Sequence, residues 1–351
     1  MIDEVIRMLP GSGESWFSIV EAAFGGSVRH PMKRRLGWVM HTMLLMALTW
    51  APAQDKPPKV RLSAKSAKFW ELVPKDAELK RVATGMGFTE GPVWDPRGFL
   101  FVSDEELNKI FRIFPDGRKE EFISLGDPDG NTYDEQHQLI DCASVLRAVI
   151  RIKADGTYEP LADRFQGKRF NSPNDVVGGP DGALYFTDPT SNLPKGQKQE
   201  LDFKGVFRLD AKGHLDLLTK ELSEPNGITF SPDGKKLYVD DSGNRNIRVY
   251  DFQRDGTIRN GRVFGEEPGG KGEGVPDGMK VDRAGNLYVT GPRGIWVWDS
   301  EGHHLGTIIV PEQAANLAWG GSDLKTLYIT ATTSVYKIRT NTTGFVPYLA
   351  Q

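Results

Sequence analysis

Apolar and polar residues alternate in short runs along most of the chain, as in "LYFTD" from Leu184 and "LYVTG" from Leu287. Alternation with a period of two predicts β-strands that bury one face. Asp-Gly and Gly-Asn pairs between the runs supply turn residues that tolerate a positive φ. Helical segments long enough to connect parallel strands are missing from the pattern. The sequence therefore predicts an all-β protein.

Six segments repeat this pattern, each with a polar residue followed by two strand-like runs. Third and fourth runs often follow, and such units repeated at ~40–50-residue intervals are typical of a β-propeller. We predict a six-bladed β-propeller over residues 76–351, closed by a strand near Leu79–Val82 that joins the last blade. The repeats are "EGPVWDPRGFLFVSD" from Glu90, "GNTYDEQHQLIDCAS" from Gly130, "PNDVVGGPDGALYFTD" from Pro173, "PNGITFSPDGKKLYVDD" from Pro225, "PDGMKVDRAGNLYVTG" from Pro276 and "ANLAWGGSDLKTLYIT" from Ala315.

The first polar position of each repeat carries a side-chain oxygen. Because the first strand of a propeller blade lines the central channel, these positions should converge at one end of it. They are occupied by Glu90, Asn131, Asn174, Asn226, Asp277 and Asn316. Carboxylate and amide oxygens suit a hard divalent cation, so we predict a metal-binding channel with Ca²⁺ and with Mg²⁺, Mn²⁺ or Zn²⁺ as alternatives.

A competing interpretation treats these residues as turn caps, because Asn and Asp often bond backbone groups where strands begin. Turn preference does not explain Glu90. Two buried acids at one channel would also repel each other unless a cation lay between them. Asp277 follows Pro276 and resembles a turn residue, yet the turn of that repeat is predicted at residues 283–286.

The N-terminus predicts export. A basic cluster at residues 33–35 precedes an apolar run over 36–50 and the sequence Ala51-Pro52-Ala53. This order is typical of a signal peptide, here residues 32–53 with cleavage near Ala53 and a periplasmic or secreted product. Residues 1–31 would be an upstream extension and residues 54–75 a linker. A short membrane anchor is the alternative.

Composition narrows the partners. The net charge of -3 offers no broad basic surface, so nucleic acid is not an expected partner, and no membrane is expected for the mature form. The single cysteine, Cys142, excludes an intrachain disulfide framework and a cysteine-rich zinc site. The chain offers no Gly-x-Ser-x-Gly elbow for a serine nucleophile. The expected partner is a small-molecule substrate, and the oligomeric state stays open.

Five motifs resemble the superfamily of gluconolactonases, regucalcin and luciferin-regenerating enzymes, closest to bacterial gluconolactonase-like proteins. The resemblance covers about Val82 to Ile338. It rests on "EGPVWDPRGFLFVSD", "GNTYDEQHQLI", "GKRFNSPNDVVGGPDGALYFTDP", "GVPDGMKVD" and "NLAWGGSDLKTLYITATTSVYKI".

This resemblance implies a six-bladed propeller with one divalent cation and hydrolysis of a sugar lactone. It implies metal ligands at Glu90, Asn226 and Asp277, with Asn174 as a fourth ligand or a substrate contact. The chain departs from the family after "FTD", where it has Pro189-Thr190, and in "SNLPKGQKQELDF", which lies where a lid or substrate loop is expected.

The leading hypothesis is an exported, metal-dependent lactonase in which the cation polarises the lactone carbonyl and activates a water. Asp277 would be the general base and Glu90 the charge anchor. Asn131 and Asn174 would orient substrate, and Arg169 and Glu200 would contact it. Two alternatives remain: a phosphotriesterase-like hydrolase on the same site, and a non-enzymatic binding propeller with structural calcium.

Overall fold

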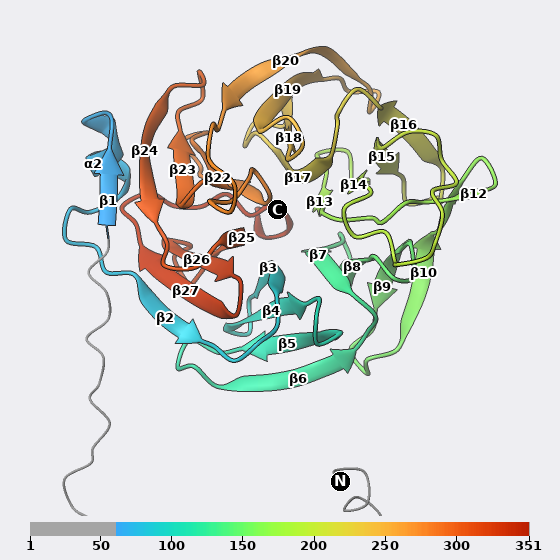
Figure 1. Cartoon of the computed structure of the whole chain (residues 1–351), viewed down its shortest axis with the longest axis horizontal. Helices are drawn as coiled ribbons and strands as arrows, with labels where there is room; N and C mark the ends of the chain where they lie inside the picture. Colours follow the sequence, from blue (N-terminus) through green and yellow to red (C-terminus); the bar gives the residue numbers. More distant parts are fainter. Residues whose placement is uncertain (1–60, 351) are drawn as a thin grey trace, which may run out of the picture. The chain divides into compact units, whose positions relative to one another are not determined.

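The computed structural model describes residues 61–350, in which six antiparallel sheets surround one channel (Figure 1). The predicted six-bladed β-propeller is confirmed. Each blade runs outward from the channel in chain order, because short turns connect neighbouring strands. The predicted signal peptide and the extension before it lie outside the described residues.

The first four blades have four strands each. Blade 1 contains β3 (Thr89–Asp95), β4 (Phe99–Asp104), β5 (Lys109–Ile113) and β6 (Lys119–Ser124); blade 2 contains β7 (Pro128–Tyr133), β8 (Leu139–Ala143), β9 (Ala148–Ile152) and β10 (Tyr158–Ala162); blade 3 contains β13 (Val176–Gly178), β14 (Leu184–Asp188), β15 (Gly205–Leu209) and β16 (Leu215–Thr219); blade 4 contains β17 (Pro225–Phe230), β18 (Lys236–Asp241), β19 (Asn246–Phe252) and β20 (Ile258–Glu266).

The last two blades each incorporate a strand from the N-terminal side. Blade 5 contains β21 (Met279–Val281), β22 (Leu287–Gly291), β23 (Gly294–Trp298) and β24 (His304–Ile309), with β1 (Arg61–Ala64) on its outer edge; blade 6 contains β25 (Ala314–Gly320), β26 (Thr326–Ala331) and β27 (Ser334–Arg339), with β2 (Lys80–Ala83) outermost. A small hairpin, β11 (Arg164–Phe165) and β12 (Lys168–Arg169), separates blades 2 and 3.

Ring closure joins the two ends of the propeller sequence. Lys80 pairs with Lys337 and Arg81 with Tyr336, so the predicted closing strand is confirmed. The sequence predicted only a linker at residues 54–75, yet β1 pairs with β24 there. Helix α2 (Lys68–Leu72) follows, and its Phe69 is fully buried against blade 5. A Cβ at Gly306 would come 2.7 Å from the Phe69 ring, so glycine permits this close packing.

The interfaces between blades form the hydrophobic core. Phe170, Phe186 and Phe207 pack with ring centroids 5.2–5.3 Å apart between blades 2 and 3. At the channel end where first strands finish, the C-terminal 3₁₀ helix η1 (Pro347–Leu349) packs in, and the Tyr348 hydroxyl donates to the Trp94 carbonyl at 2.7 Å. None of the helices in residues 61–350 is long and apolar enough to cross a membrane.

Candidate functional site

The backbone defines which residues occupy equivalent positions around the channel. Gly130 N–H donates to the Asn174 carbonyl and Gly278 N–H donates to the Ala315 carbonyl, both at 2.8 Å. A Cβ on Gly91 would collide with the Asp129 carbonyl, and one on Gly227 with the Asp277 carbonyl. The equivalent positions, which we call the donor ring, are therefore Glu90, Asp129, Asn174, Asn226, Asp277 and Ala315.

The repeat alignment was wrong in two blades. It placed Asn131 two residues and Asn316 one residue beyond the true positions, Asp129 and Ala315. The same register shift occurs in β3 and β17, where the alignment is correct, so the bulges do not cause the error. In blade 2 two polar residues, Asp129 and Asn131, compete for the position. In blade 6 the ring position is Ala315, which has no side-chain oxygen, so an alignment on polar residues selects Asn316. The donor ring thus contains three carboxylates, one more than predicted.

Glu90 begins the innermost strand of blade 1 and is only 3% exposed. Its Oε2 accepts the Gly91 N–H at 2.7 Å and the Asn316 side-chain Nδ2 at 2.9 Å. Burial raises the pKa of Glu90 to about 7, and the charge of Asp175 adds to the rise. This carboxylate is held in one orientation and lacks a full counter-charge.

Asp277 lies just before β21, two blades from Glu90 in the donor ring, and its side chain is half-buried. Burial raises its pKa well above the usual value, the Glu90 charge adds to the rise, and a hydrogen bond with the Asn226 side chain opposes it. The effect of the Glu90 charge indicates that the two acids lie near each other in the channel.

Three further acids, Glu105, Asp127 and Asp129, surround the mouth of the channel at the donor ring. The comparison of the six repeats missed them. Asp129 Oδ2 accepts the Asn174 Nδ2 at 2.7 Å and the Asn192 Nδ2 at 3.1 Å. Burial and nearby carboxylates raise the pKa of Glu105 to about 9, and burial raises that of Asp127 to about 6. The only usable signal was the Asp-Gly pair at residues 129–130, which matches the polar-Gly pairs of other repeats.

The amides occupy distinct positions. Asn174 donates through Nδ2, which leaves Oδ1 as its atom for a cation or substrate. Asn131 donates to Gly91 O, Ser103 Oγ and Asp129 O, and its buried Oδ1 has no partner in the described region. It therefore supports the backbone around the ring.

One fixed cation lies beneath the ring. The Lys280 ammonium is 4.0 Å from Asp175 Oδ2 and donates to Asn316 Oδ1 at 3.4 Å. Its charge lowers the pKa of Asp175, although burial still leaves that pKa raised. Buried Asp240, whose Oδ2 lies against Gly227, has neither carboxylate oxygen bonded within residues 61–350. The acids outnumber their cations.

The residues present fit a divalent cation held by oxygen. Within residues 61–350, no three His, Cys, Asp or Glu side chains form a ready metal cluster. The donor ring offers instead the carboxylates of Glu90 and Asp277, with amide oxygens of Asn174 and Asn226. Such mixed oxygen sets suit calcium, and the uncompensated buried carboxylates call for a positive charge.

Arg169 and Glu200 anchor a loop at the mouth. Arg169 N–H donates to Glu200 Oε2 at 2.9 Å, and its guanidinium NH2 donates to the Leu146 carbonyl at 2.8 Å. The loop between β14 and β15, which includes the segment predicted as a lid, crosses the donor-ring end and contributes Asn192. Both residues predicted as substrate contacts thus bond protein groups here.

Arg147 holds this loop from below and is 2% exposed. Its Nε donates to the Phe170 carbonyl at 2.5 Å and its NH1 to Gln197 Oε1 at 3.1 Å. Arg147→Lys keeps the charge but loses the fork of donors. We expect trypsin to cleave after the exposed Lys195 and Lys198 about 3- to 10-fold faster, because the loop opens more often.

Arg164→Lys is the matched control, because Arg164 is exposed on the β11–β12 hairpin and bonds only Gly167 and Asp163. Its cleavage time course should match that of the parent protein. Equal cleavage of the Arg147 variant would show that other contacts hold the loop closed.

Stability should depend on pH in a metal-free protein. The folded pKa of Glu90 is raised from 4.5 to about 7, so the folded state holds a proton that the unfolded state releases. Its contribution is complete below about pH 4.5 and is lost as pH rises toward 7, about 3 kcal/mol in all. With chelator, the free energy of unfolding measured by urea titration should fall over this window. Saturating calcium should remove the fall, and an unchanged slope would contradict a cation at Glu90.

Comparison with known proteins identifies the family of this chain. Residues 88–333 match the family described as SMP-30/Gluconolactonase/LRE-like region. A gluconolactonase of Zymomonas mobilis is 34% identical over 289 residues, covering 75% of this chain and 81% of that relative. A pentonolactonase of Haloferax volcanii is 29% identical over 259 residues, covering 71% of this chain and 83% of that relative.

A solved structure shows the same similarity in three dimensions. A gluconolactonase of Xanthomonas campestris superposes with a TM-score of 0.75 at 32% identity, covering 82% of this chain and 96% of that chain. The resemblance inferred from the motifs is confirmed. The protein belongs to the SMP-30/gluconolactonase/LRE-like family and is a lactonase-type hydrolase.

Proposed function

We propose that this protein is an exported lactonase that opens a sugar lactone with the help of a divalent cation, with calcium as the first choice. Glu90, Asn174, Asn226 and Asp277 would hold the cation. The observation that carries the proposal is the pair of donor-ring acids, Glu90 and Asp277, each of which raises the pKa of other channel carboxylates. A bound cation would relieve this repulsion and return both groups to the ionised form.

The bound cation would supply Lewis-acid polarisation of the lactone carbonyl. Asp277 would accept a proton from the attacking water, whose oxygen bonds the carbonyl carbon while the ring C–O bond breaks. The proton then passes to the departing ring oxygen, which becomes the hydroxyl of the product acid. Glu90, bonded to Gly91 and Asn316, would keep its position and anchor the cation.

The mouth favours a polyhydroxy substrate over a phosphotriester. Asp127, Asp129 and Glu105 provide acceptors for sugar hydroxyls, and Asn192 provides a donor above them. A phosphotriester with apolar ester groups would bind better at an apolar entrance. Asn174 Oδ1 lies with the donor ring and could bind either the cation or a substrate hydroxyl.

The deciding experiment is a panel of sugar lactones assayed by acid release, with a phosphotriester in parallel. Chelator should abolish hydrolysis and calcium should restore it, with the phosphotriester much slower than the best lactone. Unchanged lactone hydrolysis after complete metal removal would leave calcium a structural role and overturn the cation-dependent mechanism. If the phosphotriester is hydrolysed faster than the best lactone, the substrate class is a phosphotriester and not a sugar lactone.

The export proposal rests on the pattern of residues 33–53. We expect the N-terminus of the protein recovered from the periplasm or medium to map to Gln54 or within about two residues of it. Mass spectrometry of the intact protein and of its N-terminal peptide measures this. A cytoplasmic protein that retains Met1 would contradict export.

A further inference from the structure

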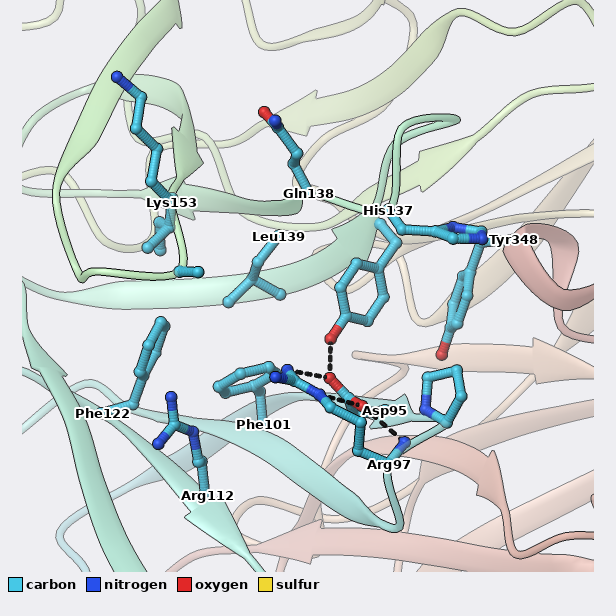
Figure 2. Close-up of a pocket in the computed structure, with 14 residues that line it drawn as sticks. Asp95, Arg97, Phe101, Arg112, Phe122, His137, Gln138, Leu139, Lys153 and Tyr348 are labelled. Atoms are coloured by element: carbon cyan, nitrogen blue, oxygen red, sulfur yellow. Dashed lines mark hydrogen bonds and ion pairs between the residues drawn. The ribbon is translucent and has the colours of Figure 1, made fainter.

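A second pocket of about 390 Å³ lies between blades 1 and 2 (Figure 2). It is lined by the turns after β3, β7 and β9, which include Arg97, Gln138 and Lys153. Asp95 at this pocket and Glu90 at the donor ring are opposite ends of β3, about 16 Å apart at the usual rise of a strand. The pocket is therefore separate from the proposed lactonase site.

The lining carries excess positive charge. Arg97, Arg112 and Lys153 are the cations, and Asp95 is the only acid among the lining residues, which leaves a net charge of +2 with His137 neutral. Asp95 is already occupied: Arg97 donates to its two oxygens at 2.8 and 2.6 Å, and the Tyr133 hydroxyl donates at 2.5 Å. Lys153 pairs with Glu159, which does not line the pocket, at 3.6 Å, so Arg112 is the lining cation that an acid within residues 61–350 does not neutralise.

Arg112 on β5 is the unusual member. Its guanidinium lies 4.5 Å from the Phe122 ring centroid and 5.8 Å from that of Phe101, so aromatic rings remove part of its hydration. The cross-strand acid, Glu120, pairs with Arg118 instead. Within residues 61–350, Arg112 has no ion-pair partner, and its buried Nε has no acceptor.

Apolar side chains form the wall next to Arg112, and His137 and Gln138 add neutral polar groups elsewhere in the lining. Figure 2 shows Leu139 near Phe101, with Phe122 beside Arg112, and Ile152 also lines the pocket. A pocket of a few hundred Å³ with apolar walls and a few fixed polar groups is typical of small-molecule sites. The wall formed by Phe101, Phe122 and Leu139 would cover a flat hydrocarbon ring well.

We propose that this pocket binds a planar organic carboxylate, such as an aromatic monoacid, at a site distinct from the lactone site. The carboxylate pairs with the Arg112 guanidinium, which can donate two parallel N–H groups. The ring of the ligand packs among Phe101, Phe122 and Leu139.

The test uses benzoate as the probe and benzyl alcohol as its neutral analogue, with binding followed by calorimetry and by NMR. We expect saturable benzoate binding that is equal with calcium and with chelator. Benzyl alcohol should bind at least about 10-fold more weakly, because it lacks the charge-assisted pair. Benzoate binding that disappears with chelator would place the ion at the lactonase site and overturn the proposal.

Arg112→Met keeps the aliphatic stem and removes the charge, and it should weaken benzoate binding at least about 10-fold. Lys119→Met is the matched control, since Lys119 also lies over a phenylalanine ring, Phe111 at 5.0 Å, but does not line the pocket. Both variants should retain lactonase activity, which verifies folding. Equal benzoate affinity in the Arg112 variant and the parent would overturn the proposal. If the Met variant does not fold, the comparison of benzoate with benzyl alcohol on the parent protein still decides.

Discussion

Asp277→Asn should lower lactonase activity at least about 100-fold at saturating calcium, within the usual range for the loss of a general base. Asparagine keeps the shape and one ligating oxygen, so the fold and some cation binding should remain. The amide has no site for the proton of the attacking water, so kcat should account for most of the loss. The measurement is steady-state hydrolysis of the best lactone across a calcium titration.

Asp233→Asn is the control for this prediction. Asp233 lies in the exposed β17–β18 turn, where it accepts hydrogen bonds from Ser231 Oγ at 2.7 Å and Lys235 N–H at 3.1 Å. Asparagine can accept the same bonds, so activity should persist and stability should change by only a few tenths of a kcal/mol. If both variants behave alike at saturating calcium, Asp277 takes no part in the reaction.

Glu90→Gln should weaken calcium binding by about 100-fold, because cation affinity depends on the number of charged ligands. The neutral side chain can still accept from Gly91 and Asn316, so the backbone should hold its position. Unlike the Asp277 variant, this variant should recover much of its activity at high calcium, since the proposed base is intact. Calorimetric titration and activity against calcium concentration separate the two roles.

The same variant should be more stable than the parent when calcium is absent. The Glu90 carboxylate is buried beside other acids, and its removal relieves desolvation and repulsion by about 2 kcal/mol at pH 8. Glu106→Gln on the exposed mouth turn is the control and should change neither calcium affinity nor stability appreciably. If the Glu90 variant is less stable than the parent in the presence of chelator, Glu90 is not an uncompensated charge that a cation would neutralise.

Residue pattern alone was sufficient for the blades and for part of the site. Alternation and turn residues are local properties, so six hairpin repeats could be counted without knowing how they pack. Glu90, Asn226 and Asp277 each precede a glycine at which two backbone segments approach closely. The repeat comparison aligned these three residues correctly. The closing strand β2 was predicted near Leu79–Val82, although two of its four residues, Lys80 and Arg81, are charged.

Only the packed structure decided which side chains meet at the channel. The alignment chose Asn131 although Asp129 holds the ring position, and it chose Asn316 because the true position, Ala315, has no side-chain oxygen. Glu105 and Asp129 lie in different blades, and the Glu105 charge raises the pKa of Asp129 only because the blades pack around one axis. In the sequence, Arg112 resembles an ordinary surface arginine. The structure shows that it stacks on Phe122 and lines a pocket shared with the next blade. Local chain chemistry sets the strands and their turns, whereas distances between charges on separate blades follow from the register and closure of the ring, which no short stretch of sequence encodes.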